Sequence, residues 1–251
     1  MKKPIRVLYI LGTGGFGGIE RHVQCILTSI DRDQIEPHLC VVRQGGVISE
    51  DIKSTGVPVS EMNATSGHDC KIFRWFPRML KGVNPDIVHA HELPFCCLLT
   101  LFLFPKIKVI LSLHCHGGEK SWRPSISGWM FRLFSKRINF FLPVSAATWK
   151  GNKRGLKYSV FYNPINMKAV PAKSAVKLEQ VISTTRQGSS IVKQKKKRIK
   201  FIGMVGRMAE QKDWWSFLRC SYEVMKQEKD VCVVTVGDGP QRKDLETFWD
   251  K

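Results

Sequence analysis

The chain has 251 residues, of which 43% are hydrophobic and 24% are charged, and its formal net charge is +19 at pH 7. This length suits one large domain or two smaller ones with ample apolar content for a core. The positive charge predicts acidic partners: nucleic acid, an anionic membrane surface or phosphorylated substrates. None of the eight cysteines forms a C-x-x-C motif, so they indicate a reducing compartment rather than a disulfide framework.

The first predicted unit is a strand, a glycine-rich turn and a helix. The apolar run IRVLYIL leads into GTGGFGG, and apolar residues at helical spacing follow. This order opens a doubly wound α/β domain, and its turn favours a phosphate at the start of the helix. Gly12, Gly14 and Gly17 fit G-x-G-x-x-G, which alone is a weak signal. The alternative is a connector that uses glycine for its geometry.

Strands and helices continue to alternate, which predicts a mostly parallel sheet with helices on both faces. The apolar block at residues 93–104 is too short to span a bilayer, which needs about 20 residues. No signal peptide is predicted at the N-terminus. Strands are expected at residues 37–42, from 57, at 85–91, 108–114, 140–144 and 159–162, and helices at 48–55, 70–81, 93–104 and 125–135, with Ser145 capping a further helix.

The composition changes after residue 163. Residues 164–198 contain few large apolar residues and many Lys, Ser and Gln, and we interpret them as a basic linker. A second α/β pattern follows: strand 199–207, helix 214–225, strand 231–236 and helix 241–249. Because such sheets usually need about 5 strands, we expect domains at 1–163 and 199–251, the second one incomplete.

Polar side chains gather where the predicted strands end. Because parallel strands end at one edge of the sheet, these side chains are expected to line a ligand crevice. Histidine there can position an acceptor hydroxyl or hold a diphosphate. A metal site is not favoured, because neither H-x-H pair has a standard zinc spacing; each histidine could also be an inert structural residue. The candidates are the Gly14–Gly18 loop, His89, His91, His114, Cys115 (for a metal only), His116 and Ser145.

Two cations follow the first strand of the second pattern. Arg207 ends V-G-R, and Lys212 precedes the next helix. A planar guanidinium and an ammonium at this position suit a diphosphate. The alternative is a pair of solvated surface charges.

Taken in order, these motifs resemble a known family. The chain contains G-G-x-E-R-H (17–22), D-I-V-H-A-H (86–91), S-L-H (112–114), V-S (144–145), Y-N (162–163), V-G-R-x4-K (205–212) and V-G-D-G-P (236–240). This series resembles the retaining glycosyltransferases of family 4, which have the GT-B fold of two Rossmann-like domains. The resemblance covers nearly the whole chain.

The resemblance implies a role for each matching residue. It implies that His114 contacts the transferred sugar and is the catalytic residue, and that Arg207 and Lys212 hold the donor diphosphate. The donor would be a nucleotide sugar, and neither a cofactor nor a metal is implied. Gly14, Gly15, Gly17 and Gly18 would approach the diphosphate, and Glu20, His89, His91, His116, Ser145 and Asn163 would line the acceptor cleft.

We therefore expect a hexosyltransferase-type enzyme that moves a sugar with retention to a saccharide or lipid-linked saccharide, in cell-surface polysaccharide synthesis. The resemblance implies a cytoplasmic protein, peripheral on the inner membrane face, with no nucleic acid partner. A docking face is predicted on residues 125–137, including Arg132, Lys136 and Arg137; the alternative is a core-facing helix. The family's E-x7-E element would lie beyond residue 251, so a truncated enzyme that does not turn over as this chain is expected.

The chain departs from the family at two positions. Pro164 and Asp213 stand where the family usually has glycine. Two other functions are weighed. One is an NADP-dependent oxidoreductase, with Arg43 after the second strand meeting the 2′-phosphate. The other is a non-enzymatic basic module that binds nucleic acid or membrane.

Overall fold

The computed structural model describes residues 3–67, 69–114, 135–148, 155–164 and 200–249. The chain divides into two compact units, residues 1–170 and 171–251, and each is described by itself. The predicted linker, apart from residue 164, lies outside the described residues, so the predicted domain boundaries stay a prediction.

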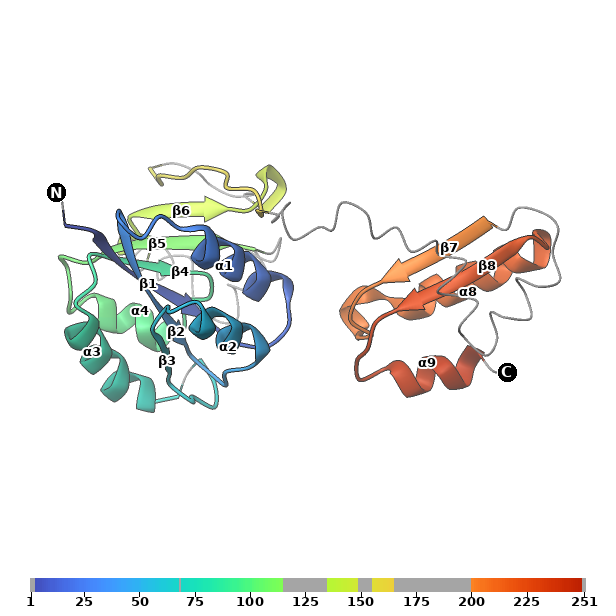
Figure 1. Cartoon of the computed structure of the whole chain (residues 1–251), viewed down its shortest axis with the longest axis horizontal. Helices are drawn as coiled ribbons and strands as arrows, with labels where there is room; N and C mark the ends of the chain where they lie inside the picture. The colour runs from blue at the N-terminus through green and yellow to red at the C-terminus, as the bar shows by residue number, and fades with distance from the viewer. Residues whose placement is uncertain (1–2, 68, 115–134, 149–154, 165–199, 250–251) are drawn as a thin grey trace. The chain divides into compact units, whose positions relative to one another are not determined.

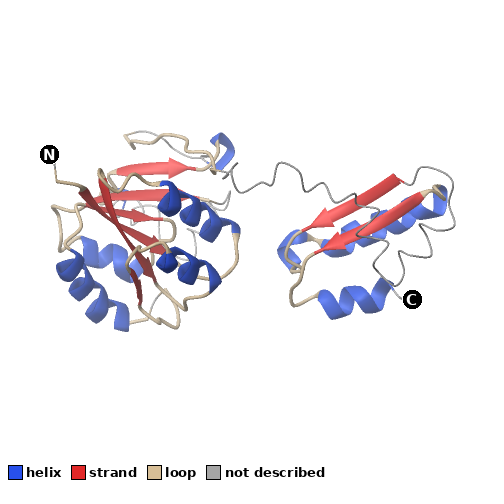
Figure 2. Ribbon diagram, in the orientation of Figure 1, coloured by secondary structure: helices blue, strands red, loops and turns tan. Residues whose placement is uncertain are grey.

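The first unit is a parallel six-stranded sheet with helices on both faces (Figures 1 and 2), which confirms the α/β prediction. The strand order is β3-β2-β1-β4-β5-β6. The strands are β1 (Ile5–Leu11), β2 (Ile35–Val41), β3 (Val59–Glu61), β4 (Ile87–Ala90), β5 (Lys108–Leu113) and β6 (Phe140–Pro143), and the helices are α1 (Gly18–Ser29), α2 (Val47–Ser54), α3 (Lys71–Val83), α4 (Phe95–Leu101) and the short 3-10 helix η2 (Ala146–Thr148).

Side chains of β1 belong alternately to two separate cores. Leu8 and Ile10 pack in a cluster with α3 and α4, whereas Tyr9 and Leu11 pack in a cluster with α1 and α2. The part of a strand that is covered on both faces must be apolar, as residues 7–11 of β1 are. The sheet therefore separates a face covered by α1 and α2 from a face covered by α3 and α4 (Figure 1).

The order in which strands are added to the sheet changes side at β1. The chain first adds β2 and β3 on one side of β1, and then crosses to add β4, β5 and β6 on the other. The loops that follow β1 and β4 therefore diverge at the carboxyl edge of the sheet. In open α/β sheets this switch point is where ligands bind.

The second unit contains β7 (Lys200–Val205) and β8 (Val231–Val236), which pair in parallel. With them lie the 3-10 helix η4 (Glu210–Lys212), α8 (Trp214–Gln227) and α9 (Arg242–Trp249). Trp214 and Leu218 of α8 pack with Leu245 of α9 in one small core. These elements agree with the sequence prediction to within about two residues.

Asp213 adopts a left-handed backbone, with φ of 51°, just before α8. Glycine reaches this conformation at the lowest cost, while Asp and Asn reach it more easily than other side chains do. The Asp213 carboxylate also accepts a hydrogen bond from the backbone N–H of Ser216 at 3.3 Å. Asp213 thus replaces the family's usual glycine without loss of the turn, and it caps α8 as well.

The strand predicted at residues 159–162 is not formed as such. The segment runs beside β6 with a single bridge between Phe141 and Tyr158. Ser159 N–H donates to the Phe141 carbonyl and Phe161 N–H donates to the Pro143 carbonyl. Because Pro143 has no N–H to donate in return, the ladder cannot extend.

The helix predicted at residues 93–104 is shorter than expected, since α4 begins only after Pro94 and ends at Leu101. Most of the helix predicted at residues 125–135 lies outside the described residues. Among the described helices, none combines the length and hydropathy needed to cross a bilayer.

Arg137 was predicted to belong to a membrane-docking face, and the structure corrects this. Its side chain is buried, and burial lowers its pKa. Its Nε donates to the Leu101 carbonyl at 2.8 Å, and Nη2 donates to the carbonyls of Phe104 and Ile107 at 2.8 and 2.9 Å. Arg137 therefore satisfies the carbonyl groups that follow α4, and it is not available to a lipid surface.

Replacing this guanidinium should destabilise the first unit. Arg137→Met removes three hydrogen bonds and leaves the buried Ile107 carbonyl without this donor, while the Leu101 and Phe104 carbonyls still accept from backbone N–H groups. We therefore expect a loss of about 1–3 kcal/mol in the free energy of unfolding. Urea unfolding followed by circular dichroism measures it. Lys136→Met, at the neighbouring exposed position, should change stability by less than about 0.5 kcal/mol. Equal effects of the two substitutions would contradict this role.

Candidate functional site

Strand alternation brings four polar side chains to the sheet face covered by α1. Val88 and Ala90 of β4, and Val109 and Leu111 of β5, belong to the core beneath α3 and α4. The alternate positions therefore face the opposite side. These positions hold His89 and His91 at the end of β4, and Ser112 and His114 at the end of β5.

His89 is buried and hydrogen-bonded. Its Nε2 lies 2.9 Å from the Ser112 hydroxyl oxygen, and its ring centroid lies 5.3 Å from that of Tyr9. Burial, assisted by the nearby rings of His22 and His114, lowers the pKa of His89 to about 3. The ring is therefore neutral at physiological pH.

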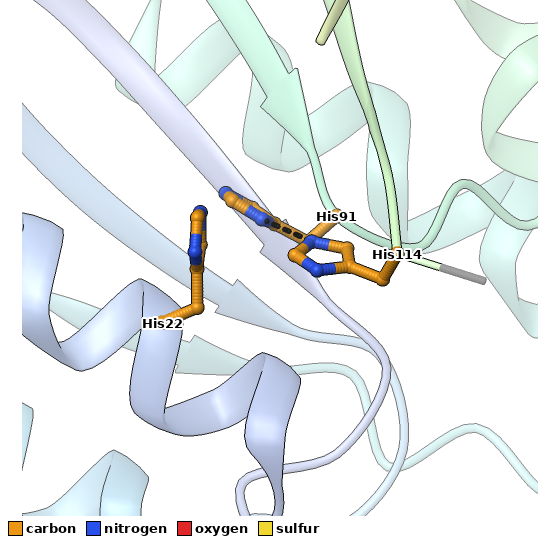
Figure 3. A group of neighbouring side chains, drawn as sticks. All are labelled: His22, His91 and His114. Atoms are coloured by element: carbon orange, nitrogen blue, oxygen red, sulfur yellow. Dashed lines mark hydrogen bonds between the residues drawn. The ribbon is translucent and has the colours of Figure 1, made fainter. Parts of the chain in front are cut away.

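His91 and His114 contact each other directly. His91 Nδ1 and His114 Nε2 lie 3.0 Å apart (Figure 3), so one of the two nitrogens carries the shared proton. Burial lowers the pKa of His91 well below its usual value and that of His114 to about 4. His114 thus acts as a neutral hydrogen-bonding group at pH 7 rather than as a cation.

His22 completes this cluster, and the sequence analysis did not single it out. It lies on the buried face of α1, and its ring centroid is 5.2 Å from that of His91 and 5.0 Å from that of His114. Burial lowers its pKa, and the nearby Asn163 side chain partly offsets this. One signal was present: position 22 falls on the same helical stripe as Ile19 and Ile26, where a histidine must be buried.

The glycine-rich loop is held against the start of α2. Gly14 N–H donates to the Gln44 carbonyl at 3.0 Å, and the Gly14 carbonyl accepts from Ile48 and Ser49 N–H at 3.1 and 3.3 Å. The peptide groups of Gly14 therefore hold the loop in place, and its N–H is not free for an anion as the loop pattern had suggested. The anion-binding role of this loop stays a prediction for Gly15, Gly17 and Gly18.

The start of α1 has no side-chain cap, so its first N–H groups remain open to an acceptor. Glu20 lies in this first turn, and its carboxylate accepts a hydrogen bond from the Thr13 hydroxyl at 2.6 Å. The same carboxylate lies against Gly17. A phosphate that approached here would therefore meet the negative charge of Glu20. To admit the phosphate, the Glu20 side chain must turn away or bind it through the hydroxyl group of an acceptor.

Two adjacent glycines of this loop should respond differently to substitution. A Cβ at Gly14 would collide with the Ser49 hydroxyl and lie 2.8 Å from the Gly46 backbone nitrogen, whereas a Cβ at Gly15 would meet no atom within 4 Å. We expect Gly14→Ala to lower the melting temperature and Gly15→Ala to leave it nearly unchanged. Thermal unfolding of the two variants measures this, and a lower melting temperature for Gly15→Ala than for Gly14→Ala would refute it.

The other predicted residues are placed as follows. Ser145 caps η2, as predicted, because its hydroxyl oxygen accepts a hydrogen bond from Thr148 N–H at 3.2 Å. Asn163 is exposed beside His22. His116 and Cys115 lie outside the described residues, so the role of His116 in an acceptor cleft stays a prediction.

A pocket lies at the switch point, between the loops that follow β1, β2 and β4. Arg43 Nη2 lies 3.7 Å from the Glu92 carboxylate, and Arg43 Nε donates to the Gly12 carbonyl at 3.4 Å. Burial raises the pKa of Glu92, and Arg43 opposes this rise. The pocket is lined by Gly12, Val42, Arg43, Gly67, Glu92, Leu93 and Pro94.

Arg207 and Lys212 lie on the turn between β7 and α8 in the second unit, and both are exposed. The Arg207 carbonyl accepts a hydrogen bond from Trp214 Nε1 at 2.8 Å, which fixes the turn. Within residues 200–249, neither side chain forms an ion pair with a carboxylate. Both charges therefore remain available for an anionic ligand.

Acid should destabilise the first unit through its buried histidines. The folded state holds His89 neutral with a pKa of about 3, whereas the unfolded chain takes up a proton near pH 6.5. Stability is therefore complete above pH 6.5 and is lost progressively as the pH falls toward 3. Urea unfolding at pH 7 and pH 5 measures the loss of stability between these pH values. We expect a smaller loss for His89→Asn than for the parent chain, because the Asn side chain does not titrate and can still hydrogen-bond Ser112. An equal loss in both proteins would refute this assignment.

Comparisons with known proteins agree with this architecture. The family model described as Glycosyltransferase Family 4 matches residues 16–168. No curated protein matches the chain significantly. Among solved structures, the Anabaena protein HepE, determined with UDP and glucose, has a TM-score of 0.64 and 14% identity over 98% of this chain and 65% of that chain.

Two further structures share the fold. A glycosyltransferase from Rickettsia africae has a TM-score of 0.61 and 16% identity, over 98% of this chain and 64% of that chain. The UDP-GlcNAc 2-epimerase of Neisseria meningitidis, bound to UDP-GlcNAc, has a TM-score of 0.55 and 15% identity, over 92% and 65% respectively. The present chain thus spans about 65% of the length of these proteins.

Proposed function

The chain belongs to Glycosyltransferase Family 4, and from this premise we propose that it transfers a sugar from a nucleotide-sugar donor to a saccharide or lipid-linked saccharide, with retention of the anomeric configuration. The observation that carries the proposal is the family match over residues 16–168. Structures of similar fold that contain UDP or a UDP-sugar support a uridine diphosphate donor.

The proposed chemistry needs positive charge on the leaving group. The bond between the anomeric carbon and the diphosphate oxygen breaks, and the diphosphate leaves with the electron pair. Arg207 and Lys212 would stabilise this developing charge. The acceptor hydroxyl forms the new bond on the same face of the sugar, and its proton passes to the departing diphosphate. His114, neutral at pH 7, would hydrogen-bond the transferred sugar and orient it.

The remaining assignments are also proposals. Glu20, His89, His91, His116, Ser145 and Asn163 would border the acceptor, and Gly15, Gly17 and Gly18 would approach the donor. We further propose a role in cell-surface polysaccharide synthesis by a cytoplasmic protein that attaches peripherally to a membrane. The basic charge of the chain supports attachment, although Arg137 takes no part in it.

The oxidoreductase alternative loses its main support. It requires Arg43 to meet the 2′-phosphate of NADP, but Arg43 is occupied by Glu92 and by the Gly12 carbonyl. A fluorescence titration with NADPH distinguishes the two functions, since a family 4 transferase should not bind it. The second alternative, a basic module without activity, would bind random DNA in a salt-dependent manner.

Binding of the donor diphosphate should depend on Arg207. Removal of a charge-assisted, two-pronged contact in Arg207→Ala should weaken UDP binding by about tenfold or more in isothermal titration calorimetry. Arg219→Ala, which removes an exposed arginine of α8, should bind like the parent chain. Loss of affinity in both variants would indicate a general charge effect, and loss in neither would contradict the proposed site.

A direct assay tests the reaction. The chain is incubated with UDP- and GDP-sugars and with saccharide acceptors, and the released nucleoside diphosphate is measured by liquid chromatography. We expect acceptor-dependent release with one class of donor. Failure of every nucleotide sugar to bind or react would overturn the proposal.

A further inference from the structure

The three histidines His22, His91 and His114 come from three different elements and face one point. His22 lies on α1, His91 follows β4 and His114 follows β5, and their rings converge in Figure 3. One nitrogen from each ring can be chosen so that all three lie within 4.8 Å of one another. Three imidazoles at this spacing can share an ion or a chain of hydrogen bonds.

A hydrogen-bond chain does not account for this cluster. The contact between His91 and His114 uses one nitrogen of each ring. Both ring nitrogens of His22, and Nε2 of His91, are buried without a hydrogen bond to any described residue. A neutral imidazole has one N–H and one lone pair, and the exposed Asn163 side chain beside His22 can engage at most one of them. At least one buried nitrogen of His22 is therefore left without a partner among the described residues. Such groups destabilise the fold unless something binds them.

The chemistry of the group selects the kind of ligand. A metal ion binds the lone pair of a neutral imidazole ring, and each of these three rings has one lone pair to offer. The group contains no carboxylate, which disfavours magnesium and calcium. Three imidazoles are a known ligand set for zinc, with a fourth position left open.

We propose that His22, His91 and His114 bind one Zn²⁺ ion. Zinc–nitrogen bonds of about 2.1 Å in a tetrahedral site separate ligand atoms by about 3.4 Å, so three nitrogens that now lie within 4.8 Å of one another must adjust to this spacing. The ion replaces the hydrogen bond between His91 and His114. Each ring keeps one proton, which moves through solvent to the nitrogen that faces away from the ion, so no net charge is lost.

The site would have a consequence for the sheet. The ion ties α1 to the ends of β4 and β5, and its fourth position remains for a water or an anionic oxygen. His114 is only partly buried, which gives the ion a path from solvent. This inference revises the expectation that no metal binds, and it rests on His22, which that expectation did not consider.

The test is metal titration of the purified chain, and it does not depend on transferase activity. After dialysis against a chelator, Co²⁺ is added as a spectroscopic substitute for Zn²⁺, and visible absorption is recorded. We expect one ion per chain with the intense visible bands of four-coordinate Co²⁺, and displacement by Zn²⁺. Absence of these bands, or weak bands of six-coordinate Co²⁺, would overturn the proposal.

Variants locate the ion. His22→Leu should weaken Co²⁺ binding by at least about tenfold, while His38→Asn, which changes a histidine bonded to Ser60 on another part of the sheet, should bind as the parent does. His22→Leu removes only unpaired nitrogens, so in chelator its melting temperature should equal or exceed that of the parent. Zn²⁺ should raise the melting temperature of the parent and of His38→Asn but not of His22→Leu. Equal metal binding by the parent and His22→Leu would refute the site.

Discussion

Burial of the central sheet on both faces is the constraint on which the rest of the first unit depends. Each inner strand must supply apolar residues to two cores at once, one under α1 and α2 and one under α3 and α4. A polar residue on such a strand is therefore expected near the end of the strand or, inside it, with a hydrogen-bond partner. His91 and His114 lie just beyond the carboxyl ends of their strands, and His89, inside β4, is hydrogen-bonded to Ser112.

The same constraint explains the electrostatics of the site. A histidine held between a sheet and a helix is cheaper to keep neutral than charged, and each neighbouring imidazole adds to this preference. The cluster therefore offers hydrogen bonds without charge, whereas we propose that the positive charge at a departing diphosphate is supplied by Arg207 and Lys212, which are exposed in the second unit. The two kinds of chemistry are thus placed on different parts of the chain.

Much of the fold could be predicted from the sequence, because the periodicity of IRVLYIL, the glycine turns and the later strands is regular. The predictions failed where tertiary context decides. Pro143 limits pairing of the segment after residue 157, and the burial of Arg137 depends on carbonyl groups 30 or more residues away. His22 was overlooked because helical spacing predicts that it is buried. The spacing does not show that His91 and His114, at the ends of two strands, lie against it. The roles of the glycine loop, Arg207 and Lys212 depend on ligands and stay predictions.

The central claim is that the sheet presents a cluster of buried, uncharged histidines at its switch point. Long-range ¹H–¹⁵N correlation spectra of the imidazole rings at pH 7 test it most directly, because ¹⁵N shifts distinguish neutral tautomers from the cation. For the metal-free chain the account predicts neutral rings for His22, His89, His91 and His114, with one shared proton between His91 and His114. Imidazolium shifts for these residues at pH 7 would contradict it.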